Sequence, residues 1–146
     1  MTNGADTSRP LLVLDFDGTV CIGDAPVWAY AEALIAALGQ RAPTEAAALE
    51  PRLRAQLTSF LDGTAGVTPY TDGYEAIAAL SANQVTTEEL QEAYLASRQQ
   101  LMSGTLEVTT PPGLVDFLHE LSDVVDTLLV TNAPLVGVRE STKALG

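Results

Sequence analysis

The sequence contains few cysteines and histidines, which limits the chemistry it can carry. One cysteine, Cys21, and one histidine occur among 146 residues. A single cysteine excludes an internal disulfide, and we expect a reducing, cytoplasmic environment. No base lies near Cys21 in the sequence, so this side chain is expected to be a small buried residue and not a nucleophile.

Basic residues are also scarce. Seven Lys and Arg stand against nineteen Asp and Glu, which gives a net charge of −12. A nucleic-acid surface needs a basic stripe, so a nucleic-acid partner is not expected. No stretch approaches the ~18 apolar residues of a membrane span, so no membrane partner is expected either. The hydrophobic fraction of 47% is nevertheless ample for a packed core.

An apolar run near the start of the chain leads directly into two carboxylates. Residues 11–14 are four aliphatics, and Asp15 and Asp17 follow them. Such a run predicts a strand buried on both faces of a parallel sheet, and open α/β sheets bind ligands at the carboxyl ends of their strands. Side chains two residues apart share one face of an extended segment. Asp15 and Asp17 therefore start on one side, with Phe16 turned away, and their repulsion favours a bound hard divalent cation.

Helical patterns follow, and a second apolar run comes after them. The expected helix signals are a stop at Gly39, a start near Pro51, and capping patterns at Asp72 with Glu75 and at Thr86 with Glu89. A short helix through residues 114–121 precedes the second strand candidate, residues 124–130. This candidate ends in Thr131 and Asn132, and Pro134 fits the start of a last helix.

This order predicts an α/β protein with a helical insertion. We expect a disordered leader in residues 1–10, a core formed by residues 11–20 with 108–146, and an inserted helical domain in residues 21–107.

Two segments resemble signatures of the haloacid dehalogenase (HAD) superfamily of phosphohydrolases. The segment Asp-Phe-Asp-Gly-Thr at 15–19 resembles the first signature, and residues 128–132 resemble the second, an apolar strand that ends in Thr or Ser. The helical insertion matches the position of the cap in the subclass with an all-helical cap. The resemblance covers residues 11–146 in order and spacing. It implies a Rossmann-like parallel sheet core, incomplete here, with an inserted α-helical cap.

The resemblance also implies an activity, a cofactor and site residues. The expected enzyme is a Mg²⁺-dependent phosphatase that acts on a small phosphorylated metabolite. Asp15 would be the nucleophile that forms an aspartyl-phosphate, and Asp17 the general acid. The Asp15 side chain and the Asp17 backbone carbonyl would bind Mg²⁺. The Gly18 N–H would face the phosphate, and Thr131, with Asn132 beside it, would hydrogen-bond a phosphate oxygen.

The acid at Asp17 narrows the substrate class. Family members that dehalogenate or cleave C–P bonds lack an acid at this position, so the resemblance implies a phosphate ester. Other Asp-x-Asp sites fit less well. Counting from Asp15, an EF-hand would need glycine where Val20 stands and glutamate where Pro26 stands. Sugar-nucleotide transferases are not expected to carry the following Gly-Thr.

Other residues are expected to have structural roles. We expect Trp28 and Tyr30 to pack in the core or on a half-buried helix face. Arg52 and Arg54 are expected in solvated helix positions, and His119 on the surface.

The match ends before two further family signatures, a basic residue and an acidic pair on a later strand. After Thr131 the chain has Arg139, Glu140 and Lys143, which come too early to be assigned to them. We therefore expect the N-terminal part of a longer hydrolase, inactive alone. The alternative is a non-catalytic HAD-like chain that binds a phosphate compound or a protein partner. Two strands alone are expected to leave apolar edges and faces exposed.

Overall fold

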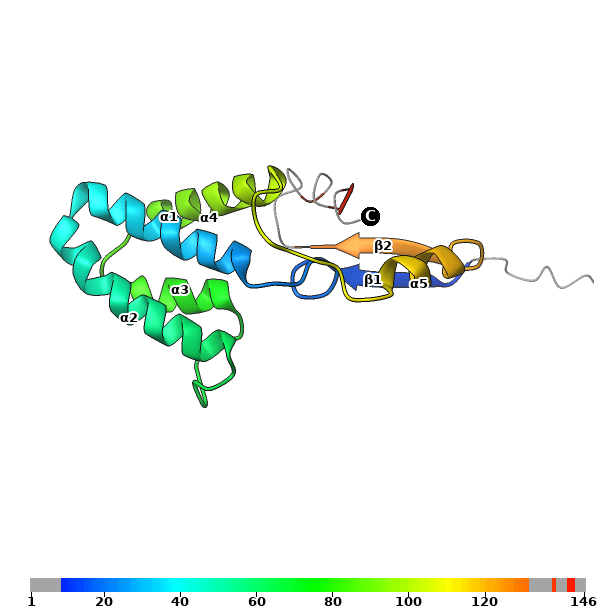
Figure 1. Ribbon diagram of the computed structural model, residues 1–146, viewed down its shortest axis with the longest axis horizontal. Helices are drawn as coiled ribbons and strands as arrows, with labels where there is room; N and C mark the ends of the chain where they lie inside the picture. The colour runs from blue at the N-terminus through cyan, green and yellow to red at the C-terminus, as the bar shows by residue number, and fades with distance from the viewer. Residues whose placement is uncertain (1–8, 132–137, 139–141, 144–146) are drawn as a thin grey trace, which may run out of the picture. The chain divides into compact units, whose positions relative to one another are not determined.

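The computed structural model describes residues 9–131, Val138, Thr142 and Lys143 (Figure 1). The chain divides into two compact units, each described here by itself. We call Met1–Gly23 with Val108–Gly146 the sheet unit, and Asp24–Glu107 the helical unit. The described residues form five helices and two strands, so the fold is mixed α/β, as predicted. None of the described helices is both long and apolar enough to cross a membrane.

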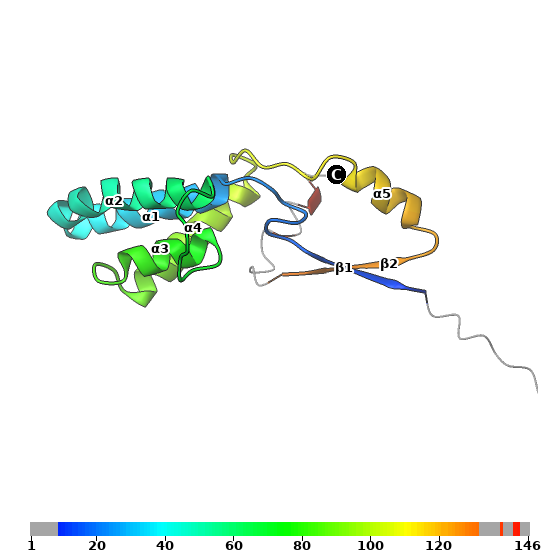
Figure 2. The ribbon, with the colours of Figure 1, turned by 90° about the horizontal axis from the view of Figure 1, so that it is seen from below.

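The sheet unit is built on two parallel strands, β1 (Leu11–Asp15) and β2 (Asp126–Val130). The register pairs Leu11 with Asp126 and Asp15 with Val130. Helix α5 (Leu114–Leu121) precedes β2 and lies on one side of the sheet (Figure 2). The parallel pairing of the two apolar runs is thus as predicted, and β2 is shorter than the apolar run that contains it.

One face of this sheet is open. In-register pairing puts Leu11, Val13, Leu128 and Val130 on the same face, where they are 59%, 55%, 46% and 49% exposed. The prediction that each strand is buried on both faces is therefore wrong for the described sheet. The physical reason is the small number of strands, since two strands offer little surface to cover each other. The accompanying expectation, that two strands alone leave apolar faces exposed, is confirmed.

A short antiparallel contact lies where the chain leaves the sheet unit and where it returns to it. The Ile22 N–H donates to the Thr109 carbonyl at 2.8 Å, and the Thr109 N–H donates to the Ile22 carbonyl at 3.0 Å. The two ends of the insertion are therefore held together by backbone hydrogen bonds.

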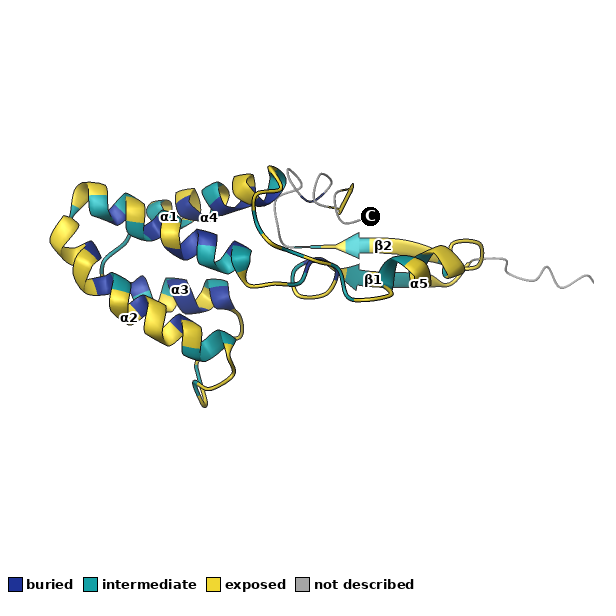
Figure 3. Ribbon diagram, viewed as in Figure 1, coloured by how far each residue is buried: buried dark blue, intermediate teal, exposed yellow. Residues whose placement is uncertain are grey.

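The helical unit consists of four helices around one apolar core (Figure 3). They are α1 (Ala25–Arg41), α2 (Pro43–Leu61), α3 (Gly73–Ser81) and α4 (Thr87–Met102). The core side chains recur at helical spacing and include fully buried aliphatics, namely Leu34, Leu38, Leu49, Leu53, Leu57 and Ile77. Helical periodicity in this part of the sequence was therefore a sound guide to the core.

Two predicted helix boundaries are wrong, and tertiary packing explains both. Helix α1 continues through Gly39 to Arg41, because Gly39 lies against α2, where an added Cβ would be 3.8 Å from the Ala46 Cβ. Helix α2 begins at Pro43 and contains Pro51 in its interior. A proline inside a helix costs about 3 kcal/mol, and the buried leucines of α2 on both sides of it offset that cost.

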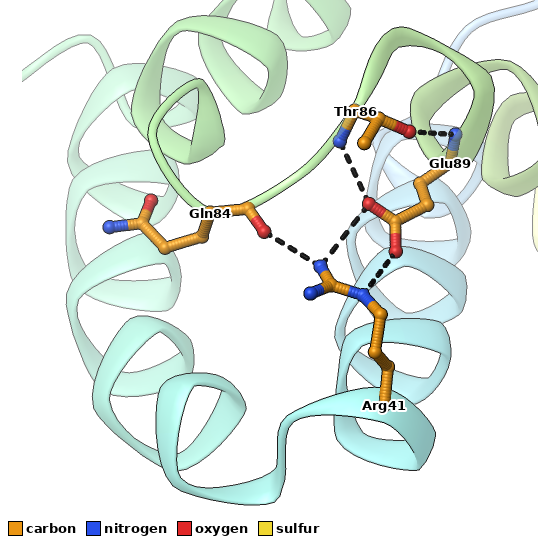
Figure 4. A network of polar contacts seen from close by, with 4 residues as sticks. All are labelled: Arg41, Gln84, Thr86 and Glu89. Atoms are coloured by element: carbon orange, nitrogen blue, oxygen red, sulfur yellow. Dashed lines mark hydrogen bonds and ion pairs between the residues drawn. The ribbon is translucent and has the colours of Figure 1, made fainter.

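The predicted N-terminal caps of α3 and α4 are confirmed. The Asp72 carboxylate accepts the Glu75 N–H at 2.8 Å. Thr86 and Glu89 form a reciprocal capping box, with the Thr86 N–H donating to Glu89 Oε2 at 2.8 Å. Arg41, at the end of α1, donates from Nε to Glu89 Oε1 at 2.8 Å and from Nη2 to the Gln84 carbonyl at 2.9 Å (Figure 4). This network joins the end of α1 to the start of α4.

Glu89 makes the stability of the helical unit sensitive to acid. Two hydrogen bonds lower the pKa of Glu89 below its usual 4.5. The larger effect comes from the Thr86 N–H and the next from the Arg41 guanidinium. When the pKa of a carboxyl group is lower in the folded state than in the unfolded state, the group stabilises the fold at any pH above its unfolded-state pKa. This stabilisation is lost as the pH falls through the folded-state pKa. We expect urea unfolding to show a steeper loss of stability between neutral pH and pH values below 4.5 in the wild type than in Glu89→Gln. Glu92→Gln, at an exposed position, is the control. Equal slopes of stability against pH for Glu89→Gln and the wild type would contradict this role of Glu89.

Gly73, the first residue of α3, is held against α1. A Cβ added at Gly73 would lie 2.6 Å from Val27 Cγ1 and 3.1 Å from Cγ2. Valine is stiff at χ1, so the clash cannot be relieved by a rotamer change alone, and we expect Gly73→Ala to destabilise by about 1–3 kcal/mol. Gly39→Ala is the matched control, because Gly39 lies in a helix interior where an added Cβ would make an ordinary van der Waals contact. This substitution should stabilise the folded protein by about 0.5–1 kcal/mol. Thermal unfolding that moved in the same direction for both variants would contradict this account.

Candidate active site

The carboxyl ends of the two strands meet at one edge of the sheet. Asp15 is the last residue of β1 and pairs in register with Val130, the last residue of β2. Thr131 follows directly and is half-buried. The structure thus brings the ends of the two signature-like segments to neighbouring positions. Asn132, the fifth predicted site residue, and the helix start predicted at Pro134 lie outside the described residues.

The chain forms a tight turn immediately after β1. The Phe16 carbonyl accepts the N–H groups of Val20 at 3.0 Å and of Cys21 at 2.9 Å. The Gly18 N–H donates to the Cys21 carbonyl at 2.9 Å, and Gly18 has φ +77°, where a side chain would be strained. The Phe16 ring is fully buried. This turn positions the backbone of Asp17 and Gly18 beside the end of β1.

The two carboxylates differ in their environments. Asp15 is exposed, and its Oδ1 accepts the N–H of Phe16 at 2.8 Å. That bond restricts the rotation of the carboxylate, which leaves Oδ2 as the oxygen not engaged by this N–H. Asp17 is half-buried, and its backbone pairs with Cys21 in a parallel bridge. The two carboxylates therefore differ in their exposure to solvent.

The predicted role of the Gly18 N–H needs a correction. This donor was expected to face a phosphate, but in the structure it donates to the Cys21 carbonyl. The cause is the closed turn itself, which uses its own carbonyl groups as acceptors. The next donor, the Thr19 N–H, makes only a long contact of 3.4 Å with the Phe16 carbonyl, so it can turn to a ligand at lower cost.

The site offers few ligands for a metal ion. Among the residues that the structure describes, no group of three or more His, Cys, Asp or Glu could hold one. The predicted ligands are two oxygens, the Asp15 carboxylate and the Asp17 carbonyl. Magnesium is commonly bound by one or two carboxylates together with waters and substrate phosphates. The donor set fits that mode of binding and does not fit a cage made entirely of protein ligands.

The residues expected to have structural roles lie as expected. Cys21 is buried, at 4% exposure, and Tyr30 is equally buried, while Trp28 is half-buried. Arg52 and Arg54 are exposed. Arg52 donates to the Leu80 carbonyl at 2.9 Å, and Arg54 donates to Glu50 at 2.9 Å. His119 is exposed on α5.

The sequence pattern did not single out Arg98, the buried charged residue among those that the structure describes. It lies on α4 and is 3% exposed. Its Nη1 donates to the Tyr74 hydroxyl at 3.5 Å, and its guanidinium carbon lies 5.9 Å from the centroid of the Tyr94 ring. Arg98 follows Tyr94 by one helical turn, on the face that also carries the buried Ala93 and Leu101. This position on the apolar face of α4 is the signal that could have identified it.

No known protein family matches the chain, and no curated protein matches it significantly.

Proposed function

We propose that the carboxyl ends of β1 and β2 form the active site of a phosphomonoester hydrolase that works through an aspartyl-phosphate. The observation that carries the proposal is the parallel register that pairs Asp15 with Val130. The end of β1, which carries Asp15, is next to the end of β2, which Thr131 follows. We further propose that the two strands belong to a Rossmann-like sheet and that the helical unit is a cap of the HAD type.

The proposed reaction has two steps. Asp15 Oδ2 attacks the phosphorus of a small phosphorylated metabolite, and the bond from phosphorus to the ester oxygen breaks. Asp17 gives its proton to the leaving oxygen. Water then attacks the aspartyl-phosphate, Asp17 takes up a proton from that water, and Asp15 is released with inorganic phosphate. Thr131 donates a hydrogen bond to a phosphate oxygen.

The Asp15 carboxylate and the phosphate of the substrate are both negatively charged, so they repel each other during the first step. Mg²⁺ bound by Asp15 and the Asp17 carbonyl would supply the positive charge that lets an anionic nucleophile approach an anionic phosphate. The exposure of Asp15 and the oxygen-only donor set support this proposal. The hydrogen bond from the Phe16 N–H to Oδ1 supports the choice of Oδ2 as the attacking atom.

Hydrolysis of an aryl phosphate tests the proposal. We assay the 146-residue chain, and any longer product of the same gene, each with Mg²⁺ and with EDTA. We expect little or no turnover from the 146-residue chain and Mg²⁺-dependent turnover from a product that also carries the two further signatures. Turnover by neither protein, with phosphate binding retained, would instead support a non-catalytic chain that binds a phosphate compound.

A further inference from the structure

The outer edge of β1 has no neighbouring strand among the residues that the structure describes. The sheet order there is β1-β2, so each strand has one paired edge and one free edge. The Asp126 N–H donates to the Pro10 carbonyl at 2.9 Å, which shows that the backbone of Pro10 faces β2. Backbone groups of successive strand residues point to opposite edges, so those of Leu11 and Val13 point to the free edge. This edge therefore offers a row of donors and acceptors to another strand.

The free edge of β1 lacks the features that usually prevent strands from pairing. Natural edge strands are blocked by charged side chains, by proline or by a bulge. Residues 11–14 are four aliphatics that pair with β2 in unbroken register. Pro10 precedes them, but the N–H that proline lacks would face β2, so proline removes no donor from the free edge. A further strand can therefore add to β1.

The two ends of β1 carry opposite charges. Arg9 and Asp15 lie three residues before and three residues after Leu12. Arg9 Nε lies 3.3 Å from the Oδ1 of Asp126, in an exposed ion pair. Its Nη2 donates to carbonyl groups of the segment that precedes β2, those of Ser122 and Val125. These contacts hold the guanidinium at the start of the sheet, and Nη1 carries two further N–H donors.

We propose that β1 pairs antiparallel with β1 of a second copy of this chain, about a twofold axis at Leu12. Leu11 then lies opposite the partner's Val13, and the two residues exchange both of their backbone hydrogen bonds. Arg9 lies opposite the partner's Asp15, where Nη1 can donate to the carboxylate. This register places apolar side chains opposite apolar ones and a positive charge opposite a negative one.

The second copy supplies what each sheet lacks. Two strands alone are marginally stable, whereas three or more strands with an apolar face support one another. The pairing removes the free β1 edge of both copies and gives a sheet in the order β2-β1-β1-β2. The outer edge of β2 fits a second copy less well, because residues 123–131 contain no basic residue. The inference does not depend on the function proposed for the strand ends, since it rests on backbone geometry and charge.

Sedimentation of the 146-residue chain over a series of concentrations tests this pairing. Each copy has a net charge of −12. The measurement is therefore made at about 0.15 M salt, where exposed charges more than about 8 Å apart are largely screened. We expect a monomer–dimer equilibrium. Val13→Pro removes an N–H from the free edge and should weaken the dimer at least about tenfold.

Thr127→Pro is the matched control for this variant. The Asp126 N–H faces β1, so the N–H of Thr127 points to the outer edge of β2. Both substitutions place a proline in a strand of the same sheet and remove an outward N–H, but from opposite edges. Thr127→Pro should therefore dimerise like the wild type.

Charge exchange gives an independent test. Arg9→Glu and Asp15→Arg each place like charges opposite each other, and each should weaken the dimer about tenfold. The double variant restores opposite charges and should recover most of the affinity. Circular dichroism checks that each variant is folded. Monomer at every concentration, or a dimer that Val13→Pro and both charge variants leave unchanged, would refute the pairing. If Val13→Pro does not fold, the charge variants alone decide.

Discussion

Replacing Asp15 by asparagine should lower the Mg²⁺-dependent turnover of an aryl phosphate at least about 10³-fold. An amide is a far poorer nucleophile than a carboxylate, and the substitution also removes the negative charge that would attract Mg²⁺. Because Asp15 is exposed at a strand end, the shape of the sheet should not change. The measurement is the release of nitrophenol under saturating Mg²⁺.

Asp126→Asn is the matched control for this experiment. Asp126 lies on the same face of the sheet as Asp15 but at the opposite end, since it pairs in register with Leu11. Its carboxylate forms an exposed ion pair with Arg9 at 3.3 Å, which contributes about 0–1 kcal/mol to stability. Turnover should therefore be preserved. If Asp15→Asn retained wild-type turnover, the aspartyl-phosphate mechanism would be excluded.

Replacing Asp17 by asparagine should slow the same reaction by about 10²–10⁴-fold, and the size of the loss should depend on the leaving group. An alkyl phosphate needs its leaving oxygen protonated, whereas nitrophenolate leaves without a proton. The loss in the first step should therefore be larger for the alkyl ester. For nitrophenyl phosphate, the second step should become limiting, because water lacks its base.

Rapid mixing distinguishes the two carboxylates. With nitrophenyl phosphate, Asp17→Asn should release a burst of about one nitrophenol per active site, followed by slow turnover. Asp15→Asn should show no burst. Equal losses on aryl and alkyl phosphates, without a burst, would assign Asp17 a purely structural role beside the turn.

Much of the architecture could be predicted because it depends on local sequence patterns. The aliphatic runs that became β1 and β2, and the caps at Asp72 and Thr86, each follow from neighbouring residues. The two misplaced helix boundaries had a different cause. Gly39 and Pro51 are helix breakers by intrinsic propensity, but packing between α1 and α2 outweighs that propensity. Such packing depends on residues distant in sequence.

The candidate site shows the same division. The placement of Asp15 at the end of a strand and beside the end of a second strand follows from the sequence pattern. The hydrogen bond that occupies the Gly18 N–H does not, because it depends on how the turn closes around the Phe16 carbonyl. Arg98 was missed because arginine is usually solvated, and a pattern of apolar residues cannot show which charged side chain is taken into the interior.

The hydrogen bonds between Ile22 and Thr109 have a consequence for how the chain folds. The strands β1 and β2 are far apart in sequence, and closing a long flexible loop before they pair would cost entropy. The helical unit is one continuous segment, Asp24–Glu107, so its contacts close shorter loops than the pairing of β1 with β2 does, and we expect it to form first. Once the Ile22–Thr109 bridge joins its two ends, the insertion no longer adds to the loop that must close. We therefore expect strand pairing to be a late, short-range step, with the site at the strand ends assembling after the helices.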